Sequence, residues 1–372
     1  MLTPEDIKRT GQSLWLDNLS RELLLSGGLS RLIRERAVTG LTSNPSIFEK
    51  ALAGEYYAGP IKRLAARGAA AEEIFETLAI EDIRGAADLL LPAHEASDGL
   101  DGFVSMEVSP KLAFDPVRTE SEALRLAGRI GRHNLMIKVP ATKEGLLAGE
   151  KLLKMGISVN FTLIFTVERY RSVTQVYTAA MSWRIKNSLP VSGIASVASL
   201  FVSRIDTAVD KLLRALPPGP AQKLAGRTAV ENSLLAYRLY HDLFYCPGFK
   251  ASGIPPQRIL WASTSVKDPA YRPALYLEEL ALGGSVNTAP EEALEAYFTG
   301  GEINRAPPGS RFAAAGAHFA ELKELGINFS AVLEDLEKDG IERFARSHDG
   351  LLARIQKEID AKEKPCTDNL LK

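Results

Sequence analysis

The chain alternates short apolar segments of strand length with longer segments whose apolar residues recur three and four positions apart. The strand-length segments number eight: 14–19, 37–44, 103–109, 135–141, 157–165, 194–201, 259–265 and 285–289. The segments between them have the periodicity of amphipathic helices: 20–36, 70–96, 120–132, 143–155, 167–189, 203–216 and 222–244. Strands that alternate with helices pair in parallel through right-handed crossovers. The pattern therefore predicts an α/β fold built on a parallel sheet.

The number of strand–helix units favours a closed barrel. Eight units within about 300 residues match a (β/α)8 TIM barrel. The alternative, an open doubly wound sheet, is typical of chains with a glycine-rich nucleotide motif, and neither G-x-G-x-x-G nor a P-loop occurs. We expect residues 1–372 to form one barrel domain. Helices within 310–360 (312–325 and 329–358) are expected to cap the barrel, and 364–372 to form a flexible tail.

Composition and charge exclude several classes of protein. The chain has 45 basic and 46 acidic side chains, so nothing draws it to nucleic acid or to an anionic membrane. No apolar run approaches the roughly 18 residues of a membrane span, and no secretory signal is present. Cys246 and Cys366 lie far apart, which suits a reducing compartment, and the histidines lack the spacing of metal ligands. We expect a soluble, cytoplasmic protein without a metal.

One lysine interrupts an apolar strand. Lys138 lies within the segment 135–140, and strands of a parallel barrel are covered on both faces, so a charge there is costly unless it is paired. Burial favours the neutral form of an amine, which is the form that attacks a ketone to give an imine. Lys138 is therefore a candidate nucleophile. The alternative is a lysine that reaches the rim or pairs with a carboxylate.

Two carboxylates stand near the ends of other predicted strands. Asp17 follows the segment 14–16, and Glu107 lies within 103–109. Barrel enzymes place their chemistry at the C-terminal ends of the strands, where two such groups can divide acid and base work or activate a water. Each is also typical of a salt bridge or a helix cap, and Asp17 could cap a helix that begins near Ser20.

Amides and hydroxyls accompany these charged groups. Asn160 and Thr162 are two positions apart, so both side chains of a strand there point to one face, as ligand-binding groups or as a satisfied core pair. Asn44 precedes Pro45, which keeps Asn44 out of helical dihedral angles. Asn44 is therefore expected at a strand-to-helix junction, where it either forms a plain turn or offers its amide to a sugar.

Two later strands end in groups suited to phosphate. Arg204 follows the sixth predicted strand, where a guanidinium and a helix N-terminus together favour a dianion. The segment 262–267 contains three hydroxyls, among them Ser263, and ends in Lys267; phosphate sites of barrels often lie near strands seven and eight. Arg204 could instead form a surface ion pair, and Ser263 a turn. Chance would scatter such groups rather than place them at corresponding strand ends.

The ordered set of segments resembles the transaldolase family from residue 14 to about 355. The segments that carry the resemblance are 40–46, 104–108, 136–142 and 157–163. The segment 262–265 and the long C-terminal part resemble a bacterial subgroup. The resemblance implies a cofactor-free transferase of the pentose phosphate pathway. Such an enzyme moves a dihydroxyacetone unit from a phosphorylated ketose to a phosphorylated aldose through a lysine Schiff base.

The resemblance also implies a role for each matching residue. Lys138 corresponds to the Schiff-base lysine, and Asp17 to the acid and base of carbon–carbon cleavage. Glu107 corresponds to a carboxylate that works through a water beside Thr162. The implied ligands of the substrate are Thr42, Asn44, Asn160 and Ser199 for the dihydroxyacetone unit, and Arg204 and Ser263, with Phe201 packed nearby, for the phosphate.

One position departs from the family pattern, and several alternatives stay open. Where many members have an arginine two positions after the serine matching Ser263, this chain has Ser265, and Lys267 is expected to supply the charge. A fructose-6-phosphate aldolase would hydrolyse the same intermediate instead of transferring it. A glycosidase could use Asp17 and Glu107 but leaves Lys138 without a role. A non-catalytic sugar-phosphate-binding barrel is a further alternative. The chain is expected to be a monomer or a homodimer.

Overall fold

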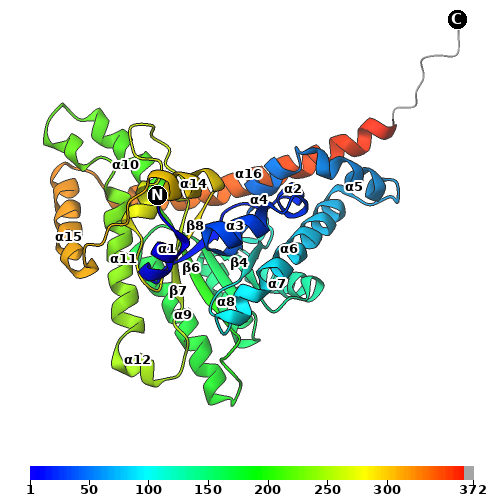
Figure 1. The fold of residues 1–372 in the computed structure, drawn as a ribbon, viewed down its shortest axis with the longest axis horizontal. Helices are drawn as coiled ribbons and strands as arrows, with labels where there is room; N and C mark the ends of the chain where they lie inside the picture. Colours follow the sequence, from blue (N-terminus) through cyan, green and yellow to red (C-terminus); the bar gives the residue numbers. More distant parts are fainter. Residues whose placement is uncertain (364–372) are drawn as a thin grey trace, which may run out of the picture.

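The computed structural model describes residues 1–363, so the expected tail at 364–372 and Cys366 lie outside the described residues. Within residues 1–363 the chain forms a closed barrel of eight parallel strands in chain order, with β1 pairing with β8 (Figure 1). The strands are β1 (Ser13–Leu16), β2 (Val38–Thr42), β3 (Val104–Glu107), β4 (Leu135–Pro140), β5 (Val159–Ile164), β6 (Ser196–Phe201), β7 (Arg258–Ala262) and β8 (Val286–Ala289). Each predicted strand segment is confirmed, and so is the (β/α)8 fold.

Helices connect the strands and extend beyond the last one. Before β4 lie α1 (Pro4–Thr10), α2 (Arg21–Leu25), α3 (Gly28–Arg36), α4 (Pro45–Ala51), α5 (Glu55–Ala65), α6 (Ala71–Ala96), the 3₁₀ helix η1 (Pro110–Leu112) and α7 (Pro116–Ile130). Between β4 and β7 lie α8 (Lys143–Lys154), α9 (Val167–Lys186), α10 (Ser203–Ala215), the 3₁₀ helix η2 (Pro220–Leu224), α11 (Thr228–Phe244) and α12 (Pro247–Ala251). After β7 lie α13 (Leu275–Glu279), α14 (Glu291–Gly300), α15 (Pro308–Glu324) and α16 (Phe329–Glu363).

The predicted helix at 20–36 is two helices. Gly27 adopts a left-handed φ of 75°, which interrupts the helix between α2 and α3. The hydroxyl of Ser20 caps α2 by accepting a hydrogen bond from the Leu23 amide at 3.1 Å. Asp17 is therefore not the cap of this helix, and its carboxylate is free for other contacts.

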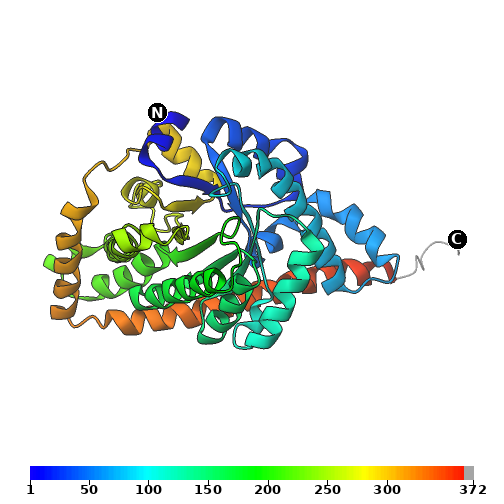
Figure 2. The same cartoon turned by 90° about the horizontal axis from the view of Figure 1, so that it is seen from below.

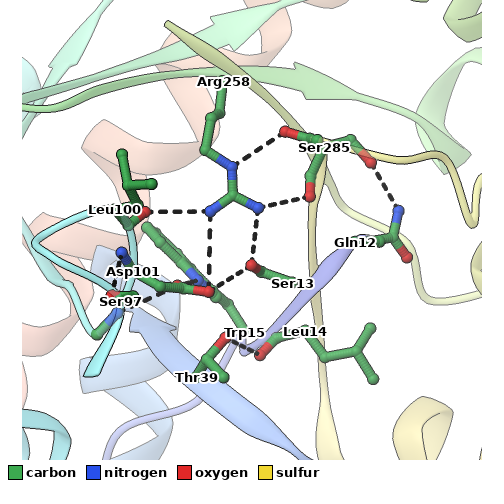
Figure 3. A network of polar contacts seen from close by, with 12 residues as sticks. Gln12, Ser13, Leu14, Trp15, Thr39, Ser97, Leu100, Asp101, Arg258 and Ser285 are labelled. Atoms are coloured by element: carbon green, nitrogen blue, oxygen red, sulfur yellow. Dashed lines mark hydrogen bonds and ion pairs between the residues drawn. The ribbon is translucent and has the colours of Figure 1, made fainter. Parts of the chain in front are cut away.

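A polar network closes the N-terminal end of the barrel (Figure 3). Asp101, just before β3, accepts hydrogen bonds from the Trp15 indole at 2.7 Å and from the Ser13 hydroxyl. Arg258, the first residue of β7, donates to the Ser13 hydroxyl at 2.7 Å. The Trp15 ring fits here because Gly40 on β2 has no side chain, and a Cβ at that position would lie 2.4 Å from the ring. The N-terminal end is thus filled by paired side chains.

The two C-terminal helices occupy different sides of the barrel. Helix α15 packs against α11, while α16 contacts α4, α5, α6 and α10 (Figures 1 and 2). Figure 2 shows α16 extending along nearly the whole width of the molecule. Its residues Phe344 and His348 point to the C-terminal end of the barrel, where Phe344 packs against Phe201 at the end of β6, with ring centroids 6.4 Å apart. No helix in the described part of the chain is long and apolar enough to cross a bilayer.

Candidate active site

A cavity of about 320 Å³ opens at the C-terminal ends of the strands. We call it the mouth cavity. It collects most of the site residues predicted from the sequence, which are Asp17, Thr42, Asn44, Lys138, Thr162, Ser199, Phe201, Arg204, Ser263 and Lys267. The other two predicted residues, Glu107 and Asn160, are buried in neighbouring positions of β3 and β5, in register with Lys138 on β4.

The amine of Lys138 is held inside the barrel wall. Its Nζ donates a hydrogen bond to the carbonyl of Ser43 at 3.0 Å and lies 3.2 Å from Oε2 of Glu107. The Phe344 ring of α16 covers it, with the ring centroid 5.6 Å from Nζ. Because Lys138 lines the mouth cavity and is otherwise enclosed, a substrate that enters that cavity can reach its nitrogen.

Glu107 is a buried carboxyl beside this amine. Burial raises the pKa of Glu107, and the charge of Lys138 only partly opposes that rise. Across residues 1–363, neither carboxyl oxygen of Glu107 has a hydrogen-bond partner, nor has Oγ1 of Thr162 in the cavity wall. A carboxyl whose pKa is raised by burial and which lies beside a reactive amine is suited to general acid and base catalysis. The unpartnered oxygens can receive a water or a substrate hydroxyl.

Asp17 lies at the end of β1 and is oriented by a chain of hydroxyls. The hydroxyl of Thr42 donates to Oδ1 of Asp17 at 2.7 Å and lies 2.7 Å from the hydroxyl of Thr288 on β8. Desolvation by the surrounding residues raises the pKa of Asp17, while the hydrogen bond from Thr42 and the charge of Lys138 lower it. Asp17 is therefore a second carboxyl with proton-transfer capacity, on another strand of the same cavity.

The amide residues have different surroundings. Asn160 is fully buried, donates to the hydroxyl of Ser105 at 3.1 Å and accepts from the hydroxyl of Ser199 at 2.7 Å. Both polar ends of its amide therefore have protein partners. Asn44 lines the mouth cavity, and its Oδ1 caps α4 by accepting from the amide of Ile47 at 3.0 Å. The strand-to-helix junction predicted at Asn44 is confirmed.

Cationic side chains gather on one side of the mouth cavity. Within residues 1–363, Nη1 of Arg204 is buried without a hydrogen-bond partner, and the guanidinium carbon lies 5.4 Å from the centroid of the Phe201 ring. Burial lowers the pKa of Arg204 and of Lys267, and for Lys267 the charges of Lys50 and Arg204 add to the effect. Cations that repel one another around a cavity favour the binding of an anion there.

Ser263 adjoins these cations in an uncommon backbone conformation. Its φ is 56°, in the left-handed region that few non-glycine residues adopt. Its hydroxyl lies 3.1 Å from that of Ser203, the first residue of α10. Lys267 donates to the Ser265 hydroxyl at 3.0 Å, which fixes the position of its ammonium group.

Sequence reasoning missed several residues of the site. Thr288 on β8 had the same signal as the others, a polar residue near the C-terminal end of a buried strand, and could have been found. Ser43 contributes only a backbone carbonyl, Lys50 lies on the last turn of α4, and Phe344 lies on α16. These three have no local signal. Among the residues described, no cluster of three His, Cys, Asp or Glu side chains could hold a metal ion.

The fold and the site define a (β/α)8-barrel protein with a buried lysine, two neighbouring carboxyls and a cationic rim at the C-terminal end. Comparison with known proteins narrows this class. The profile of the Transaldolase/Fructose-6-phosphate aldolase family matches residues 14–355. The chain is 45% identical to a transaldolase of Thermobifida fusca over 361 residues, covering 96% of this chain and 98% of that protein.

Two further relatives are also transaldolases. The chain is 44% identical to transaldolase 1 of Streptomyces coelicolor, covering 95% of this chain and 93% of that protein. It is 43% identical to a transaldolase of Thiobacillus denitrificans, covering 94% and 99%. This chain belongs to the transaldolase/fructose-6-phosphate aldolase family. The resemblance inferred from the sequence is thereby confirmed.

Proposed function

We propose that the protein is a transaldolase that transfers a dihydroxyacetone unit from fructose 6-phosphate or sedoheptulose 7-phosphate to an aldose phosphate. The observation that carries the proposal is the position of Lys138. Its enclosed amine lines the mouth cavity, which also contains Asp17 and Arg204, whose Nη1 has no hydrogen-bond partner within the described residues. The names of the relatives above support transfer as the reaction.

The first half of the reaction uses Lys138 and Asp17. The Lys138 amine adds to the ketone carbon, and loss of water from the carbinolamine gives an iminium ion. Asp17 accepts the proton of the C4 hydroxyl, and the C3–C4 bond breaks. The electron pair of that bond neutralises the iminium as an enamine, and the aldose phosphate leaves.

The second half reverses these steps with another aldose. The enamine carbon attacks the aldehyde carbon of the incoming aldose phosphate, and Asp17 returns its proton to the new alkoxide. Water then adds to the iminium while Glu107, beside Thr162, accepts the proton of that water. Collapse of the carbinolamine frees the new ketose and the Lys138 amine.

The remaining residues position the substrate. Thr42 orients Asp17, Asn44 presents its amide at the cavity wall, and Asn160 and Ser199 form the wall beside Lys138. The phosphate is bound by Arg204, Ser263 and Lys267. The guanidinium of Arg204 lies over the ring of Phe201, which holds it in place. The reaction is part of the pentose phosphate pathway and takes place in the cytoplasm. Helix α16 caps the single barrel domain.

Borohydride reduction in the presence of fructose 6-phosphate tests the proposal. Reduction of the iminium or enamine-derived imine fixes a three-carbon adduct on the protein, and peptide mass mapping should place it on Lys138. An adduct on another lysine would overturn the role of Lys138. A complete lack of adduct would overturn the reaction class and leave a sugar-phosphate-binding barrel. Free dihydroxyacetone as the main product in the presence of an acceptor would indicate an aldolase instead.

A further inference from the structure

A second cavity, of about 50 Å³, lies on the far side of Glu107 from the mouth cavity, toward α6 and α7. We call it the side cavity. Its wall includes Ser43, Phe75, Glu107, Ser109, Glu122 and His348. The volume exceeds the roughly 15 Å³ that a single water needs.

The two groups that hold the Lys138 amine both line the side cavity. They are Ser43, whose carbonyl accepts from Nζ at 3.0 Å, and Glu107, whose Oε2 lies 3.2 Å from Nζ. Lys138 itself lines only the mouth cavity. Glu107 therefore stands between the side cavity and the nitrogen at which the imine forms.

Two residues that line the side cavity, Glu107 and His348, have buried polar atoms without a hydrogen bond within the described residues. Glu107 is 8% exposed and His348 is 6% exposed. Within the described residues, both carboxyl oxygens of Glu107 and Nδ1 of His348 have no hydrogen-bond partner. Buried polar atoms are nearly always satisfied by protein or by water, and a cavity retains water when several polar groups face it. The side cavity offers such groups.

Charge distinguishes the two cavities. Carboxylates line the side cavity, with Glu72, Glu76 and Glu122 joining Glu107, while the cation there, Arg125, donates its hydrogen bonds to Glu76. Glu72 and Arg125 are exposed, so the cavity extends from the protein surface to Glu107. The mouth cavity instead carries the cations described above. An anionic sugar phosphate is repelled from the side cavity, whereas a neutral water is not.

Helix α16 forms part of both walls. Phe344 and His348 are four positions apart, so they lie one above the other on one face of the helix. Phe344 lines the mouth cavity and His348 the side cavity. The His348 ring packs edge-on against Phe75 of α6, with centroids 5.9 Å apart. One helix thus supplies a wall residue to each cavity.

We propose that the side cavity is a passage for the water released and consumed at the Schiff base, separate from the path of the sugar phosphates, and that His348 is a positioning residue for that water. The inference rests on the proposed function. In imine formation, the Glu107 carboxyl gives its proton to the departing hydroxyl of the carbinolamine, which leaves as water into the side cavity. In hydrolysis, a water from the side cavity gives a proton to the Glu107 carboxylate as its oxygen bonds to the iminium carbon.

Oxygen exchange measures this step directly. Each cycle of imine formation and hydrolysis replaces the C2 oxygen of fructose 6-phosphate with one from the solvent, so mass spectrometry in H₂¹⁸O reports the rate above the uncatalysed background. His348→Phe keeps the ring but removes the nitrogens that hold water. Ser109→Leu adds bulk to the same wall. His318→Phe is the matched control, because His318 is also buried with an unpartnered Nδ1 within the described residues but lies on α15.

We expect His348→Phe and Ser109→Leu to slow the catalysed exchange at least tenfold, with KM for fructose 6-phosphate within twofold of the unmodified protein and the borohydride adduct still on Lys138. His318→Phe should exchange at the normal rate. Normal exchange in either folded wall variant would overturn the inference alone. Absence of both exchange and adduct in the unmodified protein would instead overturn the proposed function.

Discussion

Glu107 and Lys138 lie side by side on β3 and β4, with Oε2 and Nζ 3.2 Å apart inside the barrel wall. The distance is that of an ion pair, but the oxygens of Glu107 lack a hydrogen-bond partner among residues 1–363. Burial raises the pKa of Glu107, which favours its protonated form, while the charge of Lys138 opposes this rise. This relationship supports the proposed role of Glu107 in the proton transfers of imine formation and hydrolysis.

Glu107→Gln should slow the formation of the imine. The amide keeps the shape of the carboxyl but cannot give a proton to the departing hydroxyl, and loss of general acid catalysis costs about 100- to 10,000-fold in rate. The measurement is the rate at which the borohydride-trapped adduct accumulates with fructose 6-phosphate. Glu231→Gln is the control, because Glu231 is also a buried carboxyl beside an arginine but lies on α11. Adduct formation at the normal rate in Glu107→Gln would contradict the assignment.

Asp17→Asn should stop the reaction one step later. Without a base for the C4 hydroxyl, the imine forms on Lys138 but the C3–C4 bond stays intact. Borohydride should therefore trap a six-carbon phosphorylated adduct on Lys138 instead of the three-carbon adduct, and peptide masses distinguish the two. Transfer should fall by about 100- to 10,000-fold, as expected for the loss of a general base. A three-carbon adduct formed at the normal rate would show that another group takes the proton.

Thr42→Val should change the pH dependence of transfer. The Thr42 hydroxyl donates to the Asp17 carboxylate at 2.7 Å and lowers the pKa of Asp17, against the rise caused by desolvation. Removing this hydrogen bond raises the pKa of Asp17 further. Because Asp17 must be ionised to accept a proton, the acidic limb of the kcat/KM profile should move to higher pH, so activity falls most on that limb.

The control for this shift is Thr174→Val. Thr174 is a buried threonine whose hydroxyl donates to the backbone of its own helix, α9. Its replacement should leave the acidic limb in place. If both variants show the unmodified profile, Asp17 does not govern that limb.

Much of this site follows from a local rule. A charged or amide side chain within a strand that is buried on both faces needs a hydrogen-bonding or ionic partner, or else has a functional role. The C-terminal ends of the strands of a barrel meet at one site. That rule locates Lys138, Glu107 and Asp17 without any knowledge of their contacts. The same strands are short and apolar enough to be separated from the helices by periodicity alone, and their predicted positions agree with the barrel.

The remainder depends on contacts between distant segments, which leave no trace in the local sequence. Phe344 covers Lys138 only because α16 returns across the barrel end from more than 200 positions away. Asn160 shares the strand pattern of Thr162, yet its amide is hydrogen-bonded to Ser105 on β3 and Ser199 on β6. The break at Gly27 comes from its backbone conformation, which leaves the amphipathic periodicity of the sequence unchanged.

Arg204→Met should weaken substrate binding while stabilising the free protein. A charge-assisted contact to phosphate is worth about 1.5–3 kcal/mol, so KM for fructose 6-phosphate should rise about 10- to 100-fold. In the absence of phosphate, removing a half-buried guanidinium whose buried Nη1 lacks a partner among the described residues relieves a desolvation cost, so Tm should rise. Inorganic phosphate should raise the Tm of the unmodified protein more than that of the variant.

Arg184→Met provides the contrast for both readouts. The Arg184 guanidinium is also buried, but it donates to the carbonyls of Pro190 at 2.8 Å and Lys154 at 2.6 Å. Its loss should lower Tm and leave KM unchanged. A lowered Tm in Arg204→Met, together with an unchanged KM, would place Arg204 among the structural arginines instead of the phosphate ligands.

The network at the N-terminal end of the barrel should affect stability without affecting chemistry (Figure 3). Asp101 is buried and accepts hydrogen bonds from Trp15 and Ser13. Its carboxylate also lies 3.8 Å from the guanidinium of Arg258, at the distance of an ion pair. Asp101→Ala leaves the Trp15 indole without its acceptor and the Arg258 charge without its carboxylate, and breaking a buried pair costs about 3–5 kcal/mol. The free energy of unfolding from denaturant titration should fall by that amount, with kcat per folded molecule unchanged.

The control is Asp88→Ala, which removes an exposed partner of Arg132 and should cost less than about 1 kcal/mol. Because the network and Lys138 stand at opposite ends of the same barrel, a fall in kcat of folded Asp101→Ala would show that the two ends of the barrel are coupled.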